Sequence, residues 1–159
     1  MPVQRSAKGQ REHIQRILDQ IEKKEVQVGF FESSAYEDGT PVAYVAAIQE
    51  FGYPEGGIPA RPFLRPTIAQ QQAAWRETLQ RGFRAAVNDQ ITVQFMLEQF
   101  GMAAAGQVKV TITKISEPPL AAATLQARQS RKKTPGVSAK PLVDTGLLIS
   151  SVQSAVVDR

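Results

Sequence analysis

Hydrophobic positions near the start of the chain recur at a helical spacing. Four of them fall at i, i+3, i+4 and i+7: Ile14, Ile17, Leu18 and Ile21. This spacing places them on one face of an amphipathic helix, which we expect over residues 8–23. The next segment, residues 26–31, is short and alternates hydrophobic and polar positions in period two, which is typical of a β-strand.

Proline and glycine mark the ends of the following segment. Thr40 and Pro41 are typical of a helix cap followed by proline at the first helical position. Gly52 is suited to end that helix after Phe51, because glycine adopts left-handed conformations without steric cost. Residues 53–66 then contain four prolines and two glycines, which predicts a long extended loop.

Two long helical patterns follow. The first is expected over residues 66–87, with a buried side formed by Ile68, Trp75, Leu79 and Phe83. Asn88 and Asp89 predict a break, and the second pattern extends over residues 90–115. Within it, residues 107–115 fit either a helix or a strand, and we favour the helix because no turn residue precedes them.

The last third of the chain predicts shorter elements. Pro118 and Pro119 end the long helix, and residues 120–129 suit a short helix. Residues 150–157 alternate as a closing strand that could pair with residues 26–31. The whole pattern predicts a mostly helical α+β fold with a small antiparallel sheet, in a single domain over residues 1–159.

The composition excludes several kinds of chemistry. The chain has no cysteine and one histidine, His13, which excludes a disulfide scaffold, a thiol nucleophile, thiolate zinc sites and multi-histidine metal sites. His13 lies at the edge of the first apolar stripe, and no nucleophile-elbow or phosphate-binding glycine motif is present. We therefore expect no catalytic residues, no metal and no cofactor. The longest hydrophobic run, residues 42–48, is too short to cross a bilayer, so we expect no membrane partner and synthesis in the cytoplasm.

The positive charge is concentrated in one segment. The net charge is +4, but five positive residues lie between residues 128 and 140 with no acidic residue among them: Arg128, Arg131, Lys132, Lys133 and Lys140. We expect a mobile basic loop over residues 129–141 on a nearly neutral body. Two interpretations are open: a solvated loop, or a surface that attracts DNA phosphates or an acidic partner. The segment has no aromatic residue for base stacking.

One motif has an enzymatic alternative. Asp144, Thr145 and Gly146 follow two hydrophobic residues, as does the catalytic motif of aspartic proteases, in which two close carboxylates share a proton. The 13 residues after Gly146 are too few to form the flap and the supporting sheet of a protease half. We therefore expect a structural turn that caps one short helical turn through Ile149.

The proline-rich segment has two interpretations. Each proline fixes its φ angle and lacks an amide donor, so residues 58–66 are stiff and extended. Such a segment is either a rigid loop packed on its own domain or a loop that docks on a neighbouring subunit, where aromatic residues and arginines dominate binding. The candidate interface residues are Ile58, Pro59, Arg61, Pro62, Phe63, Leu64 and Arg65.

Two stretches resemble signatures of neck and tail-completion proteins of long-tailed bacteriophages. The first, residues 42–66, contains Val-Ala-x-x-Ala-Ala-Ile-Gln-Glu-Phe-Gly and then Ile-Pro-Ala-Arg-Pro-Phe-Leu-Arg. The second combines Pro-Pro-Leu-Ala-Ala-Ala-Thr-Leu-Gln-Ala-Arg at residues 118–128 with Lys-Pro-Leu-Val-Asp-Thr-Gly at residues 140–146 and Ser-Val at residues 151–152. In that context the Asp-Thr-Gly sequence is a structural turn.

The resemblance implies a virion structural protein at the junction of head and tail, without catalytic activity. Its expected partners are further copies of itself in a ring, with six-fold symmetry favoured, and the connector, neck and tail-tube proteins of the phage. Phe63, Leu64 and Arg61 would then fill contacts between protomers, and the basic loop would face either packaged DNA or an acidic ring. The alternative is a small DNA-binding or packaging accessory protein that uses residues 128–140.

Overall fold

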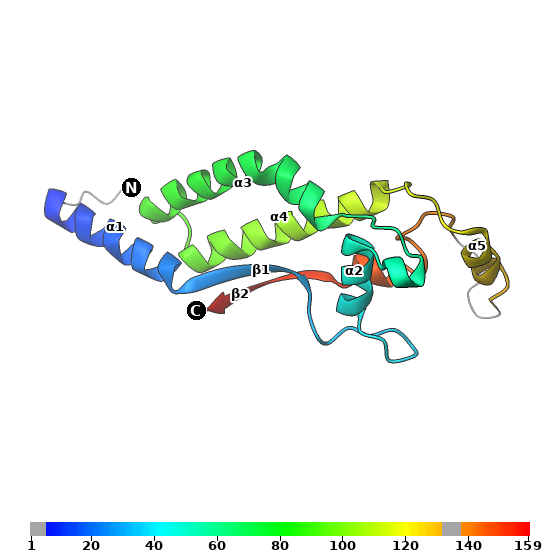
Figure 1. The fold of residues 1–159 in the computed structure, drawn as a ribbon. Coiled ribbons are helices and arrows are strands. Elements are labelled where there is room, and N and C mark those ends of the chain that lie inside the picture. The colour runs from blue at the N-terminus through cyan, green and yellow to red at the C-terminus, as the bar shows by residue number, and fades with distance from the viewer. Residues whose placement is uncertain (1–5, 132–137) are drawn as a thin grey trace. The chain divides into compact units, whose positions relative to one another are not determined.

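The computed structural model of the chain describes residues 6–131 and 138–159 (Figure 1). It is 59% helical, with one two-stranded antiparallel sheet that pairs β1 with β2, so the predicted α+β class is confirmed. In chain order the elements are α1 (Ala7–Glu22), β1 (Lys24–Phe30), α2 (Val42–Phe51), the 3₁₀ helix η1 (Pro54–Gly56), α3 (Leu64–Val87), α4 (Val93–Lys114), α5 (Ala122–Gln129), α6 (Leu147–Ser150) and β2 (Val152–Asp158).

Three details of the predicted elements are corrected. Pro41 precedes α2 as its N-cap, and Thr40 does not cap the helix as predicted. Helix α3 begins at Leu64, two residues before the predicted start at Pro66, because another part of the chain supplies its cap. The expected extended loop over residues 53–66 also contains η1.

The ambiguity at residues 107–115 is resolved in favour of a helix, since α4 continues without interruption to Lys114. Val108 and Ile112 are buried and four residues apart, so they lie on one face of that helix. Val110, which a buried strand face would share with them, is half exposed. In the described parts of the chain, no helix has the length and apolar character needed to cross a membrane.

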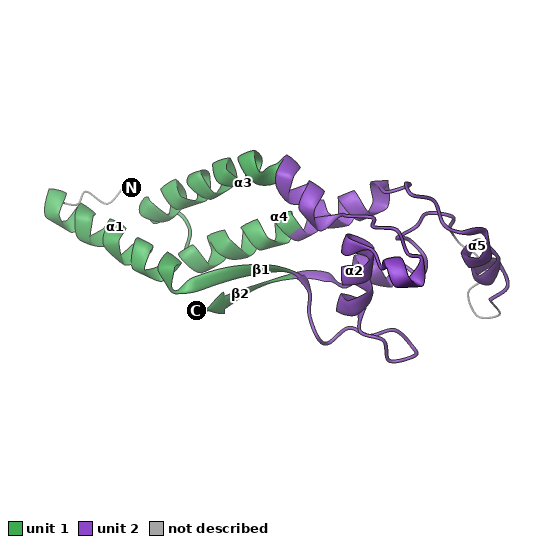
Figure 2. Ribbon diagram, viewed as in Figure 1, with its two compact units in different colours: residues 1–28, 71–104, 154–159 green, residues 29–70, 105–153 purple. Residues whose placement is uncertain are grey.

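The chain contains two compact units (Figure 2), and the single domain over residues 1–159 stays a prediction. Unit 1 comprises residues 1–28, 71–104 and 154–159, and unit 2 comprises residues 29–70 and 105–153. Both long helices and both strands run from one unit into the other. Each unit is described separately below.

The core of unit 1 lies between α1, α3, α4 and the sheet. Its buried members are Ile17, Ala86, Val93, Met96 and Leu97, with Val26 and Val156 packed against them. His13 is also held in this unit, where its Nε2 lies 3.0 Å from the carbonyl oxygen of Val87. The histidine therefore connects α1 to the end of α3 and is partly buried, as expected for a residue at the edge of the stripe.

The core of unit 2 combines apolar and charged side chains. Phe63 is completely buried and packs edge-on against Phe30, with ring centroids 5.9 Å apart. The buried polar and charged residues here are Glu50, Arg61, Thr67, Arg128 and Ser151. Within the described ranges, every buried side-chain nitrogen and oxygen atom has a hydrogen-bond partner. The burial of these polar and charged side chains is therefore compensated by hydrogen bonds.

Two glycines in α4 have opposite surroundings. A Cβ atom on Gly101 would lie 3.0 Å from Cβ of Ser154 and 3.1 Å from Cγ1 of Val26, so this turn of the helix closely approaches both strands. A Cβ atom on Gly106 would meet no atom within 4 Å. Only the first glycine is required by packing.

We predict opposite effects of substituting these two glycines. Gly101→Leu forces the helix away from the strands and lowers stability by about 1–3 kcal/mol. Gly106→Ala raises stability by up to about 1 kcal/mol, because alanine has the higher helix propensity. Urea unfolding followed by circular dichroism measures both. Equal effects of the two substitutions would contradict the close approach at Gly101.

Candidate functional site

The Glu50 carboxylate lies at the N-terminus of α3 in unit 2. Glu50 comes from the last turn of α2 and is 2% exposed. Its Oε2 accepts hydrogen bonds from the backbone N–H groups of Phe63 and Leu64, at 2.7 and 2.9 Å. Its Oε1 accepts from the backbone N–H and the side-chain Nε of Arg65, at 3.1 and 2.9 Å. One buried carboxylate thus receives four hydrogen bonds.

This arrangement satisfies the whole first turn of α3. A helix leaves its first N–H groups without partners, and a polar N-cap side chain ordinarily binds them. Here the residue before the helix is Phe63, which cannot do so, and Glu50 supplies the cap from 13 positions upstream. Pro66 has no N–H to satisfy, and the N–H of Thr67 donates to the carbonyl of Phe63. The negative charge also lies at the positive end of the helix dipole.

The hydrogen bonds keep Glu50 ionised. Burial raises the pKa of its carboxyl, but the N–H groups of Leu64, Phe63 and Arg65, together with the Arg65 side chain, more than offset this effect. The net pKa lies below the ordinary 4.5. In the folded protein at neutral pH, the Glu50 carboxylate is therefore charged.

The residues next to Glu50 shape the loop that it binds. Arg65 donates from Nη2 to the Glu50 carbonyl oxygen at 2.7 Å and lies over the ring of Phe51, 5.0 Å from its centroid. Gly52 has φ +80°, and a Cβ atom there would lie 2.9 Å from the backbone nitrogen of Ala60. Glycine is therefore needed at position 52, where the backbone passes close to residue 60. The Glu-Phe-Gly sequence thus supplies a cap, a stacking partner and a turn.

Arg61 forms a second buried contact in unit 2. It is 4% exposed, and its Nε and Nη2 donate to the carbonyl oxygens of Pro118 and Pro119 at 2.7 and 2.8 Å. Its Nη1 reaches Oε1 of Gln49 at 3.3 Å. Burial lowers the pKa of the guanidinium, and the positive charge of Arg128 lowers it further. Arg61 thus joins the proline-rich loop to the segment that follows α4.

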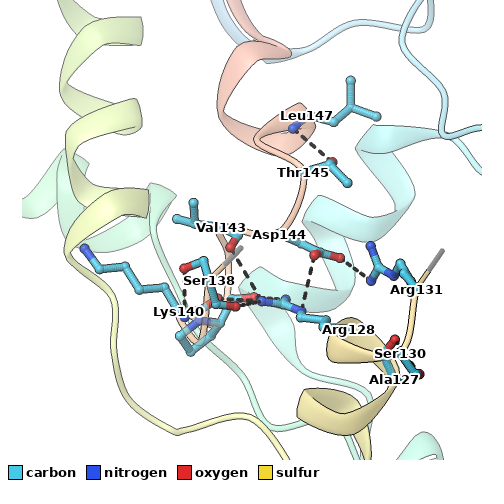
Figure 3. Close-up of polar contacts among 11 residues, drawn as sticks. Ala127, Arg128, Ser130, Arg131, Ser138, Lys140, Val143, Asp144, Thr145 and Leu147 are labelled. Atoms are coloured by element: carbon cyan, nitrogen blue, oxygen red, sulfur yellow. Dashed lines mark hydrogen bonds and ion pairs between the residues drawn. The ribbon is translucent and has the colours of Figure 1, made fainter. Parts of the chain in front are cut away.

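Arg128 is the centre of a third cluster (Figure 3). It lies in α5, is 7% exposed, and donates to carbonyl oxygens of the segment before α6: those of Ser138, Lys140, Pro141 and Val143. Its Nε also lies 3.6 Å from Oδ1 of Asp144. Arg131 binds the other oxygen of the same carboxylate. The two arginines therefore hold this segment against α5.

The predicted basic loop is corrected by these contacts. Arg128 is buried and cannot face DNA, because it holds backbone carbonyl oxygens of its own chain. Arg131 is paired with Asp144, and Lys140 donates to the carbonyl oxygen of Thr113 at 3.1 Å. Lys132 and Lys133 lie outside the described residues. The described part of the basic segment thus uses its charge in intramolecular contacts.

The Asp-Thr-Gly sequence forms a turn at the start of α6. Gly146 has φ +79° and precedes the helix, and the Leu147 N–H donates to Oγ1 of Thr145 at 3.4 Å. Asp144 pairs with two arginines and borders a pocket of about 320 Å³ that also includes Tyr36 and Asp38. Burial, followed by the charges of Asp144 and Asp38, raises the pKa of Tyr36. Among the described residues, no cluster of three histidine or acidic side chains could hold a metal.

The proposed subunit-interface residues separate into two groups. Arg61 and Phe63 are buried inside unit 2, so they cannot fill a contact between protomers, and that prediction is wrong for both. Ile58, Pro62 and Leu64 are partly buried, whereas Pro59 and Arg65 are exposed. Because its anchors point inward, the proline-rich segment mainly follows the other interpretation, a rigid loop packed on its own domain.

Sequence reasoning missed Glu50 as the residue that organises this unit. Its signal was present: an apolar helix whose single charged residue lies immediately before a phenylalanine and a glycine. A lone charge in such a helix is a candidate for burial with partners, since an unpaired buried charge is costly. The partners, 13 to 15 residues away, could not be identified from spacing.

No family model matches the chain, and comparisons with curated proteins and with solved structures found no match.

We predict that Glu50→Gln destabilises the protein by about 2 kcal/mol at neutral pH, because an amide leaves buried N–H groups without a charged acceptor. The folded pKa of Glu50 is lowered, so its contribution is present above the unfolded value of 4.5 and is lost as pH falls through the folded pKa. The difference between wild type and variant should therefore shrink in acid. Thermal unfolding between about pH 7 and pH 3 measures it.

The matched control for that experiment is Glu77→Gln, an exposed glutamate of α3. We expect it to change stability by less than about 0.5 kcal/mol. A Glu50→Gln deficit that grows in acid would contradict an ionised cap.

We also predict that Arg61→Lys destabilises the protein by about 1–3 kcal/mol. A lysine ammonium cannot reproduce the fork that binds two successive proline carbonyl oxygens, so one buried acceptor loses its partner. Arg84→Lys, at an exposed position of α3, is the control. Chemical unfolding of both variants tests this. Equal unfolding midpoints for Arg61→Lys and Arg84→Lys would refute a stabilising role for the Arg61 guanidinium.

Proposed function

We propose that the chain is a virion structural protein of the neck or tail-completion region of a long-tailed phage, which joins the head connector to the tail as a ring of identical copies. Its role is assembly, without catalysis. Its partners are further copies of itself and the connector, neck and tail-tube proteins beside it.

The observation that supports this proposal is the contact between the two stretches that carry the family resemblance. Arg61, from the Pro-Ala-Arg-Pro-Phe-Leu-Arg sequence of the first stretch, binds the carbonyl oxygens of Pro118 and Pro119, which begin the second. Within the first stretch, Glu50 binds Phe63, Leu64 and Arg65. Within the second, Arg128 binds the segment that contains Asp144. The residues that carry the resemblance thus include those that make the polar contacts within unit 2.

The resemblance therefore falls on residues that have a structural role in this fold. Motifs of apolar and small residues recur by chance, but here the charged residues of both stretches have defined partners in one folded unit. The DNA-binding alternative loses support, because three of its five cations bind their own chain.

The experiment is a deletion of the gene in the phage or prophage that encodes the chain. We expect lysates of the mutant to contain DNA-filled heads and separate tails when viewed by negative-stain electron microscopy, because the joining ring is missing. Supplying the wild-type chain from a plasmid should restore complete particles, and mass spectrometry should detect the chain in them. Complete infectious particles without the chain would refute the proposal.

A further inference from the structure

Unit 2 contains a pocket of about 320 Å³ that has both apolar and polar lining residues. It is lined by the loop before α2, by α2 itself, by Arg128 of α5 and by the segment that leads into α6. The apolar part of the lining is formed by Val45, Leu142, Leu147 and Leu148, of which Leu142 and Leu148 are buried. A cavity of this size suits one small ligand or one inserted side chain.

Asp38 gives this pocket a carboxylate that has no positively charged partner in the described ranges. Its Oδ1 accepts a hydrogen bond from the backbone N–H of Thr40 at 2.9 Å. Hydrogen bonds from the backbone and the side chain of Thr40 lower the pKa of Asp38, so this carboxyl is charged at neutral pH. Because a carboxylate accepts up to about four hydrogen bonds, Asp38 retains capacity for a ligand.

Tyr36 shows that the potential inside the pocket is negative. Its side chain is partly buried, and its hydroxyl has no hydrogen bond to a described residue. Burial raises the pKa of Tyr36, and the negative charges of Asp144 and Asp38 raise it further. The same charges that oppose ionisation of the phenol favour a positive group beside it. Asp144 is already paired with Arg128 and Arg131 (Figure 3), so Asp38 is the carboxylate that remains for a ligand.

The turn that carries these two polar side chains is held by its own backbone. The N–H of Tyr36 donates to the carbonyl oxygen of Thr40, and the N–H of Gly39 donates to that of Tyr36, both at 2.9 Å. A further bond of 2.9 Å from the N–H of Val42 to the carbonyl oxygen of Ser34 fixes the turn to the start of α2. The polar groups are therefore in place before a ligand arrives, which lowers the entropic cost of binding.

We propose that this pocket binds an aliphatic ammonium group: Asp38 pairs with the charge, the Tyr36 hydroxyl oxygen accepts a second hydrogen bond, and the leucines contact the alkyl stem. An ammonium group has three donors and no acceptor, which matches the acceptors that the site offers. Thr40 already binds the Asp38 carboxylate, so a point-like ammonium suits it better than a guanidinium fork that needs both oxygens. A metal ion would require more acidic ligands than the described residues bring together.

Two sources carry this chemistry: a lysine side chain of a neighbouring protein and a free aliphatic diamine. The inference goes beyond the proposed function and does not depend on it.

The test is an NMR titration of the isotope-labelled chain with n-butylammonium at about pH 7. We expect saturable shifts of backbone amides that line the pocket, including those of Asp38, Thr145 and Gly146, and no such shifts with the uncharged analogue n-butanol. Asp38→Asn keeps an oxygen for the Thr40 N–H but removes the charge, so it should lower the affinity at least about tenfold. Tyr36→Phe should lower it about threefold, because one hydrogen bond is lost.

The matched control is Glu37→Gln, which removes the neighbouring exposed carboxylate without changing a residue that lines the pocket. We expect its affinity to stay within about twofold of wild type, since exposed charges outside a site contribute little. The unperturbed amides of each variant establish that it folds. Equal shifts with n-butanol, equal affinities of wild type and Asp38→Asn, or the absence of saturable shifts with n-butylammonium would overturn the inference.

Two further probes distinguish the sources of the ammonium group. Nα-acetyl-lysine methylamide represents a lysine side chain of a protein, and 1,4-diaminobutane represents a free diamine. An affinity at least about tenfold higher for the lysine derivative assigns the site to a neighbouring protein, and an equal or higher affinity for the diamine assigns it to a free amine. Either result supports the site, whereas affinities for both that do not exceed that for n-butanol would refute it. Phage particles that lack the chain would refute the proposed function and leave the site unaffected.

Discussion

The buried carboxylate of Glu50 is the interaction on which unit 2 depends. It joins the end of α2 to the beginning of α3, because it accepts hydrogen bonds from three backbone N–H groups and from the Arg65 side chain. With this carboxylate removed, the first turn of α3 has no capping side chain, because Phe63 and Pro66 cannot provide one. Phe63 would also lose the contact that fixes its backbone as its ring enters the core. One charge thus sets the start of a helix and the position of a core side chain.

Two buried arginines likewise bind irregular segments of unit 2 through polar contacts. Arg61 binds carbonyl oxygens of the segment after α4, and Arg128 binds those of the segment before α6. Backbone carbonyls in irregular segments need donors when they are buried, and a guanidinium supplies several in a fixed geometry. Charged residues that first suggest a nucleic-acid surface therefore act inside the fold.

Local sequence patterns predicted most elements because their signals are short-range. The stripe from Ile14 to Ile21 predicted α1, and the alternating segments at both ends predicted the paired strands. Gly52 was correctly placed at the end of α2. The start of α3 was missed because its cap comes from Glu50, and propensity at Pro66 favoured a later start. The interface role assigned to Arg61 and Phe63 was wrong, because their partners lie in segments that only the fold brings together.

The exposed apolar surfaces show what local patterns could not resolve. Sequence reasoning treated Tyr44 and Phe51 as part of an ordinary helix, and only the fold distinguishes its covered face from its exposed one. An apolar groove of unit 1, lined by residues that include Trp75 and Phe100, likewise arises from helices that are distant in sequence. Both surfaces are of the kind that marks sites of association.

The ionised Glu50 cap can be tested directly by following the backbone amide protons of Phe63, Leu64 and Arg65 by NMR as pH is lowered. The account predicts that all three shift together with a single apparent pKa below 4.5, since they donate to one carboxylate whose pKa is lowered. The same shifts should be absent in Glu50→Gln. Amide protons that titrate independently, or a shared pKa above 4.5, would contradict it.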